Sequence, residues 1–303
     1  MKPIIHLKSI TDINNFSQCT TKHPLVAVFD FSKADEFNEG DVRISADFYS
    51  MIFKNYCANT IRYGRQSLDF QEGSLVCIGP KQLITLDNEK DNEKEKEMKG
   101  WGLFFHPDLL YGTSLGSKIQ DYSFFSYAMA EALHLSQKEE QTLSDCVKML
   151  EIELNENIDH HSQTLLVSTI ELLLNYCSRY HDRQFITRKR SNSKIIVQLE
   201  ALLKAHFHTT ESAASSLPTV TSLAEGVHLS PSYLSDLLKK ETGMNAQDFI
   251  HYHLIEVAKN RLLTHDAAVG EIAYSLGFEY PQYFSRLFKQ KTGQTPLEFR
   301  NKS

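Results

Sequence analysis

The chain has 303 residues, 41% of them hydrophobic, and a formal net charge of -6. This length predicts two domains with ordinary buried cores. The acidic balance excludes a protein that is basic throughout.

The cysteines and the N-terminal segment indicate the cellular compartment. Five cysteines are scattered without a Cys-x-x-Cys pair: Cys19, Cys57, Cys77, Cys146 and Cys177. They favour buried free thiols over a disulfide framework or a zinc site. The N-terminal segment is too polar for a signal peptide, and no apolar run approaches the ~20 residues that cross a bilayer. We expect a cytoplasmic protein without a membrane partner, a metal or a cofactor.

The first part of the chain has the pattern of short strands. Residues 1–22 are predicted to be an irregular lead-in, and strands with turns between them continue to about residue 105. Their apolar and aromatic runs lie at 25–31, 48–54, 61–70, 74–79 and 102–105. Many short strands favour a small barrel or a sandwich. The charged tract 87–99 is expected to be a solvated hairpin tip rather than a partner-binding segment.

Aromatic side chains are dense in this region. Those that can line a pocket for an apolar or aromatic effector are Phe48, Phe53, Tyr63, Phe70 and Trp101. The alternative is that each belongs to the core. No histidine lies between His23 and His106, which argues against an imidazole-based metal site.

Helical patterns follow from about residue 108 to about 182, beginning with a short element at 124–133. Ser136 and Glu139 form a capping-box pair before a helix that runs to about residue 156. A second helix at about 160–180 is apolar over more than one stripe, which requires burial on two sides. A partner subunit can supply one side. We therefore expect a homodimer through helices at about 137–180, with burial inside one chain as the alternative.

The last third of the chain contains one unit twice. Residues 231–243 and 281–293 align without a gap and share these pairs: Pro231/Pro281, Tyr233/Tyr283, Ser235/Ser285, Leu237/Leu287, Lys239/Lys289, Thr242/Thr292 and Gly243/Gly293. In each copy proline begins a helix, apolar residues recur at i, i+3 and i+4, and glycine ends it. A short apolar segment and a tight turn precede each copy. This is the helix-turn-helix plan, which places the second helix in the DNA major groove.

Residues 276–300, LGFEYPQYFSRLFKQKTGQTPLEFR, resemble the C-terminal signature of the AraC/XylS family of transcription regulators. The resemblance covers about residues 193–303. It implies helix-turn-helix units at about 219–243 and 269–293, joined by a linker helix at about 246–263 with Asn245 as its N-cap. The family usually carries a cupin-like β-barrel before this domain, and residues 71–82 resemble its turn-and-strand pattern.

The expected fold is therefore α+β. Residues 1–186 are predicted to form a cupin-like sensing or dimerisation domain with a helical extension. Residues 187–192 are predicted to be a linker, with a first helix at 195–206 after it. Residues 193–303 are predicted to form the all-α DNA-binding domain.

Base reading requires exposed side chains near the start of each recognition helix. In the second unit these are Gln282, Tyr283 and Arg286, with Lys289 suited to phosphate. Glutamine can pair with adenine and arginine with guanine. The corresponding residues in the first unit are Ser232, Tyr233, Ser235, Asp236 and Lys239. Either tyrosine can instead be a packing residue, and Asp236 can instead pair with Lys240.

Charge distinguishes the two units. Residues 191–303 hold 11 basic and 11 acidic side chains, so the net charge of -6 lies in the rest of the chain. Residues 281–293 contain Arg286, Lys289 and Lys291 and no acid, whereas the first copy is mixed. We expect the second unit to attract phosphate more strongly than the first.

The leading hypothesis is a sequence-specific regulator that binds double-stranded DNA and whose N-terminal domain senses a small-molecule effector, forms a dimer, or does both. One rival is a cupin-type isomerase or oxygenase, against which the missing histidines count. Another is a cupin-type ligand-binding protein whose helical domain binds protein. The polar face around Gln282 and Arg286 disfavours that last reading, since a protein-binding face is expected to be more apolar.

Overall fold

The structure, a computed structural model, describes residues 4–33, 42–54, 61–63, 66–68, 73–86, 100–128, 131–187, 189–209, 216–264 and 267–302. The chain divides into two compact units, Met1–Thr187 (unit 1) and Arg188–Ser303 (unit 2). Within the described ranges no helix has the length and apolar character that a membrane crossing requires. The charged tract 87–99 and the side chains of Tyr63 and Phe70 lie outside the described part of the molecule.

The described strands of unit 1 form two separate five-stranded sheets. The order in the first sheet is β1 (Ile4–Leu7), β3 (Val42–Ala46), β8 (Leu83–Leu86), β5 (Ile61–Tyr63), β6 (Gln66–Leu68). The order in the second is β10 (Leu133–His134), β7 (Ser74–Ile78), β4 (Tyr49–Lys54), β9 (Gly100–Phe105), β2 (Val26–Asp30). The combination of helices with largely antiparallel sheets confirms the α+β class. The described sheets do not close on each other, so the cupin-like barrel stays a prediction.

The prediction of an irregular lead-in is wrong. β1 pairs in parallel with β3, and α1 (Ile10–Phe16) follows it. The helix begins at a capping box, in which Asp12 N–H donates to Ser9 Oγ at 3.2 Å and Ser9 N–H donates to Asp12 Oδ2 at 2.9 Å. Elements this short have no readable periodicity, and the buried Ile10 is what attaches α1 to the core.

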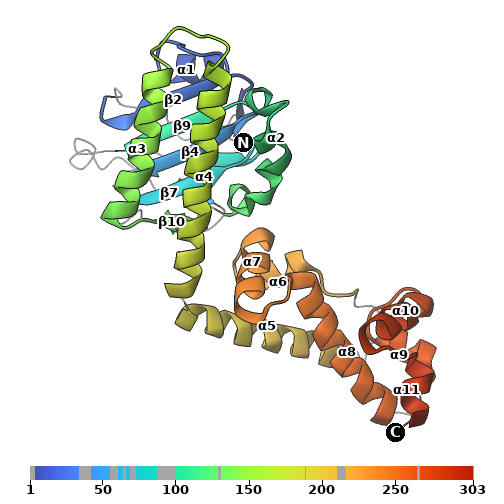
Figure 1. The fold of residues 1–303 in the computed structure, drawn as a ribbon. Coiled ribbons are helices and arrows are strands. Elements are labelled where there is room, and N and C mark those ends of the chain that lie inside the picture. The colour runs from blue at the N-terminus through green and yellow to red at the C-terminus, as the bar shows by residue number, and fades with distance from the viewer. Residues whose placement is uncertain are drawn as a thin grey trace. The chain divides into compact units, whose positions relative to one another are not determined.

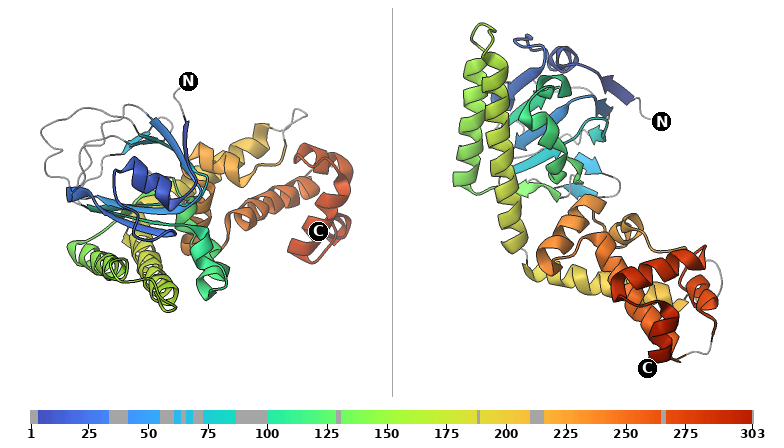
Figure 2. Two further views of the ribbon diagram at one scale, coloured as in Figure 1. Left: turned by 90° about the horizontal axis from the view of Figure 1, so that it is seen from above. Right: turned by 45° about the vertical axis from the view of Figure 1, so that its right-hand side comes forward.

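The two faces of the second sheet pack against different layers. Along β9, Phe104 joins a buried cluster with Ile44 of the first sheet and Ile10 of α1. Trp101 points to the opposite face, where its indole N–H donates to Ser144 Oγ of α3 (Gln137–Glu153) at 3.1 Å. α3 and α4 (Ser162–Thr187) lie side by side across that face (Figure 1). A second view shows α1 on the other side of the sheet (Figure 2).

The segment between the sheets and α3 consists of short turns. It contains η3 (Pro107–Leu110), α2 (Ser114–Lys118), η4 (Ile119–Asp121) and η5 (Ser123–Ser126). The element predicted at 124–133 is therefore only a 3-10 turn followed by β10. Phe124 and Phe125 of η5 are buried. Their ring centroids lie 5.2 Å apart, and Phe125 also packs against Tyr49.

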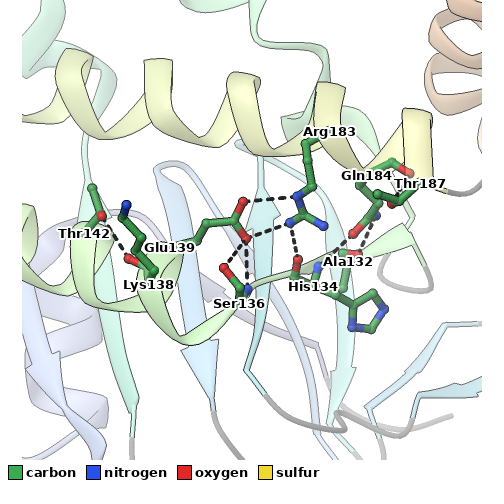
Figure 3. A network of polar contacts seen from close by, with 9 residues as sticks. All are labelled: Ala132, His134, Ser136, Lys138, Glu139, Thr142, Arg183, Gln184 and Thr187. Atoms are coloured by element: carbon green, nitrogen blue, oxygen red, sulfur yellow. Dashed lines mark hydrogen bonds and ion pairs between the residues drawn. The ribbon is translucent and has the colours of Figure 1, made fainter.

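A polar network holds the last turns of α4 to α3 and β10 (Figure 3). Arg183 donates to both carboxylate oxygens of Glu139, at 3.1 and 2.8 Å, and to the carbonyl of His134 at 2.7 Å. Glu139 also accepts from Ser136 N–H at 2.9 Å, which confirms the predicted start of α3. The buried Gln184 side chain accepts from His134 N–H at 2.9 Å and donates to the Ala132 carbonyl at 3.2 Å. Gln184 thus satisfies backbone groups at the edge of the sheet.

Unit 2 is helical throughout its described part. Its helices are α5 (Lys189–Thr209), α6 (Val220–Gly226), α7 (Pro231–Thr242), α8 (Ala246–Thr264), α9 (Val269–Ser275), α10 (Pro281–Thr292) and α11 (Pro296–Lys302). α5 begins inside the segment expected to be a linker, six residues before its predicted start. α8 packs against α5, α6 and α7 and also against α9 and α11, while α10 packs on α9 and α11 (Figure 1). One buried core runs through all these contacts.

The predicted start and stop signals of these helices are present. Asp248 N–H donates to Asn245 Oδ1 at 2.9 Å, so Asn245 is the N-cap of α8. Pro231 and Pro281 occupy first-turn positions, where a missing N–H costs nothing. Gly243 and Gly293 end α7 and α10 at φ values of 76° and 79°, the left-handed region that disfavours a side chain.

Candidate nucleic-acid interface

Each predicted recognition helix buries one face completely. In α7 the core residues are Leu234, Leu237 and Leu238, and in α10 they are Phe284 and Phe288. All five have 0% exposure. Because these residues recur at i, i+3 and i+4, the remaining positions face away from the core. The outer face of each helix is therefore the surface available to a ligand.

The outer face of α10 carries the residues predicted for base and phosphate contact. Gln282, Tyr283, Arg286 and Lys289 are all exposed. They span two turns at the start and middle of the helix, and Ser285 between them is half-buried. Glutamine and arginine at such positions present the donors and acceptors that major-groove base edges recognise. This face is polar and carries no acidic side chain.

The paired tyrosines of the repeat differ in environment. Tyr233 in α7 is 4% exposed, whereas Tyr283 in α10 is 59% exposed. Tyr283 packs edge-on against Tyr280, with ring centroids 5.8 Å apart. The two alternatives considered for these residues therefore separate, with Tyr233 assigned to packing and Tyr283 to the exposed face. Sequence alignment of the copies does not reveal this, since the two residues occupy the same register.

The first helix-turn-helix unit, which contains α7, exposes fewer of its predicted contact residues. Ser232, Ser235 and Asp236 are half-buried, and Lys239 is exposed. Ser230 caps the helix by accepting from Tyr233 N–H at 3.2 Å, so this serine is occupied by the backbone. Compared with α7, α10 therefore exposes more of its predicted contact residues.

Lys291, which contributes to the basic charge of the second copy, forms an ion pair within unit 2. Its ammonium group donates to Asp248 Oδ1 of α8 at 2.7 Å. The Lys291 hydrogen bond lowers the pKa of the Asp248 carboxyl below its ordinary value. Lys291 is thus paired inside the domain, and Arg286 and Lys289 are the exposed basic groups of α10 that are available to phosphate.

Tyr280 and His228 are two further exposed side chains near the recognition helices, and neither was predicted as a contact residue. Tyr280 precedes α10, and its ring is about half exposed beside Tyr283. His228 occupies the turn between α6 and α7 at a φ of 59°, and its side chain is exposed. Tyr280 lies directly before α10 and His228 lies three residues before α7, each in the turn of a helix-turn-helix unit. That position is the signal that could have identified them.

Three of the five aromatic residues expected to line an effector pocket have described side chains, namely Phe48, Phe53 and Trp101. Phe48 packs edge-on against Phe104 at 6.0 Å, on the face of the second sheet that meets the first sheet. Phe53 packs against Trp101 at 5.8 Å, on the face covered by α3. The second sheet therefore separates Phe48 from Phe53 and Trp101, and the effector pocket stays a prediction. Phe48, Phe53 and Trp101 are all buried core residues.

Other candidate chemistry is sparse in the described residues. No cluster of three or more histidine, cysteine or acidic side chains there is suited to hold a metal ion. Cys77, Cys146 and Cys177 are buried, and burial raises the pKa of each thiol, which keeps it protonated and unreactive. Cys19 is exposed, contrary to the expectation of buried thiols, and Cys57 lies outside the described ranges.

Unit 2 thus contains two helix-turn-helix units that share one core through α8. This arrangement defines a class of domain, the bipartite helix-turn-helix domain of the DNA-binding type. Residues 223–302 match the family described as "Helix-turn-helix domain".

Three curated relatives illustrate the match. The uncharacterized HTH-type transcriptional regulator YijO of Escherichia coli is 31% identical over 128 residues, which are 42% of this chain and 42% of the relative. The bifunctional transcriptional activator/DNA repair enzyme AdaA of Bacillus subtilis is 39% identical over 85 residues, 28% of this chain and 40% of the relative. The arabinose operon regulatory protein of Escherichia coli is 34% identical over 93 residues, 31% and 32% of the two chains. In each case the match spans less than half of the relative.

Proposed function

We propose that the chain is a sequence-specific DNA-binding transcription regulator that reads two adjacent half-sites with α7 and α10. The observation that carries this proposal is the exposed polar face of α10. Gln282 and Arg286 are exposed on a helix whose other side is wholly buried. Packing therefore holds the helix in place, while these two side chains are exposed toward a DNA groove. The duplication supplies the second reading helix on the same core.

The proposal assigns roles to individual residues. Arg286 and Gln282 contact base edges, Tyr283 contacts a base or the sugar-phosphate backbone, and Lys289 contacts phosphate. Ser232, Ser235, Asp236 and Lys239 form the contact face of the first unit. Residues 191–303 carry no net charge, and Lys291 is paired with Asp248. We therefore expect weak non-specific affinity for DNA, with a shallow dependence on salt concentration.

Selection from a random double-stranded DNA pool tests this proposal. The full chain is incubated with the pool at fixed salt, and bound sequences are recovered over several rounds. We expect two conserved half-sites whose centres lie about one helical turn, roughly 34 Å, apart. Recovery of sequences with no shared motif would remove the assignment of α7 and α10 as reading helices.

We also propose that unit 1 is a regulatory unit that pairs two chains through α3 and α4. These helices leave apolar side chains exposed on their outer surface: Met149, Ile152, Leu165 and Leu172, at 45–64% exposure. Exposed apolar side chains on two neighbouring helices are the kind of surface that a second copy covers. The proposal includes effector control of this unit, and no pocket is assigned to the effector.

Sedimentation equilibrium of the full chain tests the pairing. We expect a dimer for the unmodified chain and a monomer for the double variant Leu165→Glu/Leu172→Glu. Val197→Glu is the matched control, since Val197 is also an exposed apolar residue but lies on α5. An unmodified chain that is monomeric at all concentrations, or a control that dissociates equally, would contradict this interface.

A further inference from the structure

Arg261 of α8 binds the ends of two other helices at once. Its Nη1 donates to the carbonyl of Ser275 at 2.9 Å and to Ser275 Oγ at 2.6 Å. Its Nη2 donates to the carbonyl of Phe207. Ser275 is the last residue of α9, and Phe207 lies in the last turn of α5. One guanidinium group thus joins α5, α8 and α9.

The chemistry of helix ends explains why an arginine suits this position. The last four carbonyls of a helix have no partner within it, and the C-terminus carries partial negative charge. Arg261 supplies a positive charge and donors to two such ends. Ser275 Oγ donates its own proton to the Ile272 carbonyl at 2.9 Å, which leaves its lone pairs to accept from Arg261. The guanidinium fork reaches both carbonyls from one side chain, which a lysine ammonium cannot do in the same geometry.

The hydrogen bonds of Arg261 connect the two helix-turn-helix units. α5 packs on α6 and α7 and so belongs to the first unit, whereas α9 packs on α10 and belongs to the second. Both units are attached to α8 by the apolar core. Apolar packing is not directional, so it permits small rotations of one unit about α8. The hydrogen bonds of Arg261 are directional and oppose such rotations, because they fix α5 and α9 to one point of α8.

Arg300 offers a structural comparison. It too donates to carbonyls near a helix end, namely Leu262 at 3.1 Å and Ala267 at 2.8 Å. Arg300 lies on α11, and both acceptors lie at the end of α8 or in the segment before α9. These two hydrogen bonds tie α11 to the end of α8 and to the segment before α9, and neither reaches α5. Arg300 matches Arg261 in chemistry and in its number of carbonyl partners, but it does not bridge the two units.

We infer that Arg261 is a positioning residue that sets the spacing between the two DNA half-sites. This inference rests on the proposed function. Each base pair added between half-sites moves the second one by about 3.4 Å and turns it by about a tenth of a turn. A domain held at one angle about α8 accepts one spacing, and a domain free to rotate accepts neighbouring spacings as well.

The test compares spacing preferences of full-length variants. The half-sites recovered with the unmodified chain are placed in a set of duplexes whose spacer differs by one base pair at a time. For the unmodified chain we expect one spacing to bind best. For Arg261→Gln we expect the ratio of binding at that spacing to binding one base pair away to fall about ten-fold, the effect of losing a charged hydrogen bond. The half-site sequences themselves should not change.

Arg300→Gln is the matched control. Both substitutions should lower the thermal unfolding midpoint of unit 2, so stability alone does not distinguish the roles. Only Arg261→Gln should broaden the spacing preference. A folded Arg261→Gln protein with the unmodified spacing profile would overturn the inference, and so would equal broadening by Arg300→Gln.

A second variant covers the case in which Arg261→Gln fails to fold. Ser275→Ala removes one acceptor of the guanidinium and leaves the arginine in place. It should broaden the spacing preference less than Arg261→Gln but in the same direction. A folded Ser275→Ala protein without any broadening would then count against the inference. If the unmodified chain recovers no half-sites in the pool selection, the proposed function itself fails and this inference falls with it.

Discussion

Tyr233 and Tyr283 occupy the same position in the two copies of the duplicated unit, yet the first is buried at 4% exposure and the second is 59% exposed. The buried ring belongs to the packing of α7 in the first unit. The exposed ring lies beside Gln282 and Arg286 on the outer face of α10. One position of the repeat is therefore buried in the first copy and exposed in the second.

Alanine substitution should separate these roles. Tyr233→Ala should destabilise unit 2 by about 3 kcal/mol, because it opens a cavity in a packed site. Tyr283→Ala should change the free energy of unfolding by less than about 0.5 kcal/mol, since its ring is on the surface, but should weaken DNA binding. Urea unfolding followed by far-ultraviolet circular dichroism, together with binding to the selected site, measures both effects. Equal effects of the two variants on stability would contradict the assignment.

Lysine substitutions in α10 should differ in their effect on the salt dependence of DNA binding. Lys289 is exposed and is assigned to a phosphate, so Lys289→Gln should reduce the slope of log affinity against log salt by about 1. Lys291 is paired with Asp248 at 2.7 Å, so Lys291→Gln should leave the slope nearly unchanged. The measurement is a salt titration of binding to one duplex. A larger change for Lys291→Gln than for Lys289→Gln would reverse the roles.

Protonation of His23 should destabilise unit 1. Burial lowers the pKa of this imidazole below its ordinary value of 6.5, and its Nδ1 accepts from Leu25 N–H at 3.1 Å. The unfolded chain therefore takes up the proton first as the pH falls. The His23 contribution to stability is complete above about pH 6.5 and is lost as the pH falls through the lower pKa of the folded state.

The single tryptophan of the chain, Trp101, lies buried in unit 1 and reports on its unfolding. Midpoints of urea unfolding measured by its fluorescence should decrease from pH 7 to pH 5. His23→Asn is the matched control, because its side-chain oxygen can accept from Leu25 N–H but does not titrate. This variant should show a flatter pH dependence. An identical decrease in both proteins would assign the effect to other groups.

The network at the end of α4 predicts an order of stability effects. Gln184→Ala should cost about 2 kcal/mol, since it leaves a buried N–H of His134 and a buried carbonyl of Ala132 without their partner. Arg183→Gln should cost about 1 kcal/mol, because Arg183 is more than a third exposed and its ion pair with Glu139 is weakened by solvent. Trp101 fluorescence measures both. A larger loss for Arg183→Gln would show that the ion pair dominates the network.

The helices of unit 2 were predictable because their signals are local. Pro281, the apolar spacing of Phe284 and Phe288, and Gly293 together define both ends and the buried face of α10. Asn245 similarly marks the start of α8. Such signals depend on residues within a few turns of each other, so a single sequence contains them.

Features that depend on tertiary packing could not be predicted in this way. The exposure of Tyr283 depends on what neighbouring helices cover, and the pairing of Lys291 depends on the approach of α8 to α10. Phe48, just before β4, packs on Phe104, whereas Phe53 packs on Trp101 at the opposite face of the second sheet. β1 was missed because its four residues pair with a distant strand and carry no periodic signal.

The central claim is that α10 reads base edges through Arg286. The most direct test measures the affinity of the full chain and of Arg286→Ala for the selected duplex and for each of its single base-pair variants, at one salt concentration. The account predicts that the arginine variant loses about 1–3 kcal/mol on the selected duplex and no longer discriminates at one base position, while discrimination elsewhere is retained. A variant with the same affinity and the same discrimination at every position would contradict the claim.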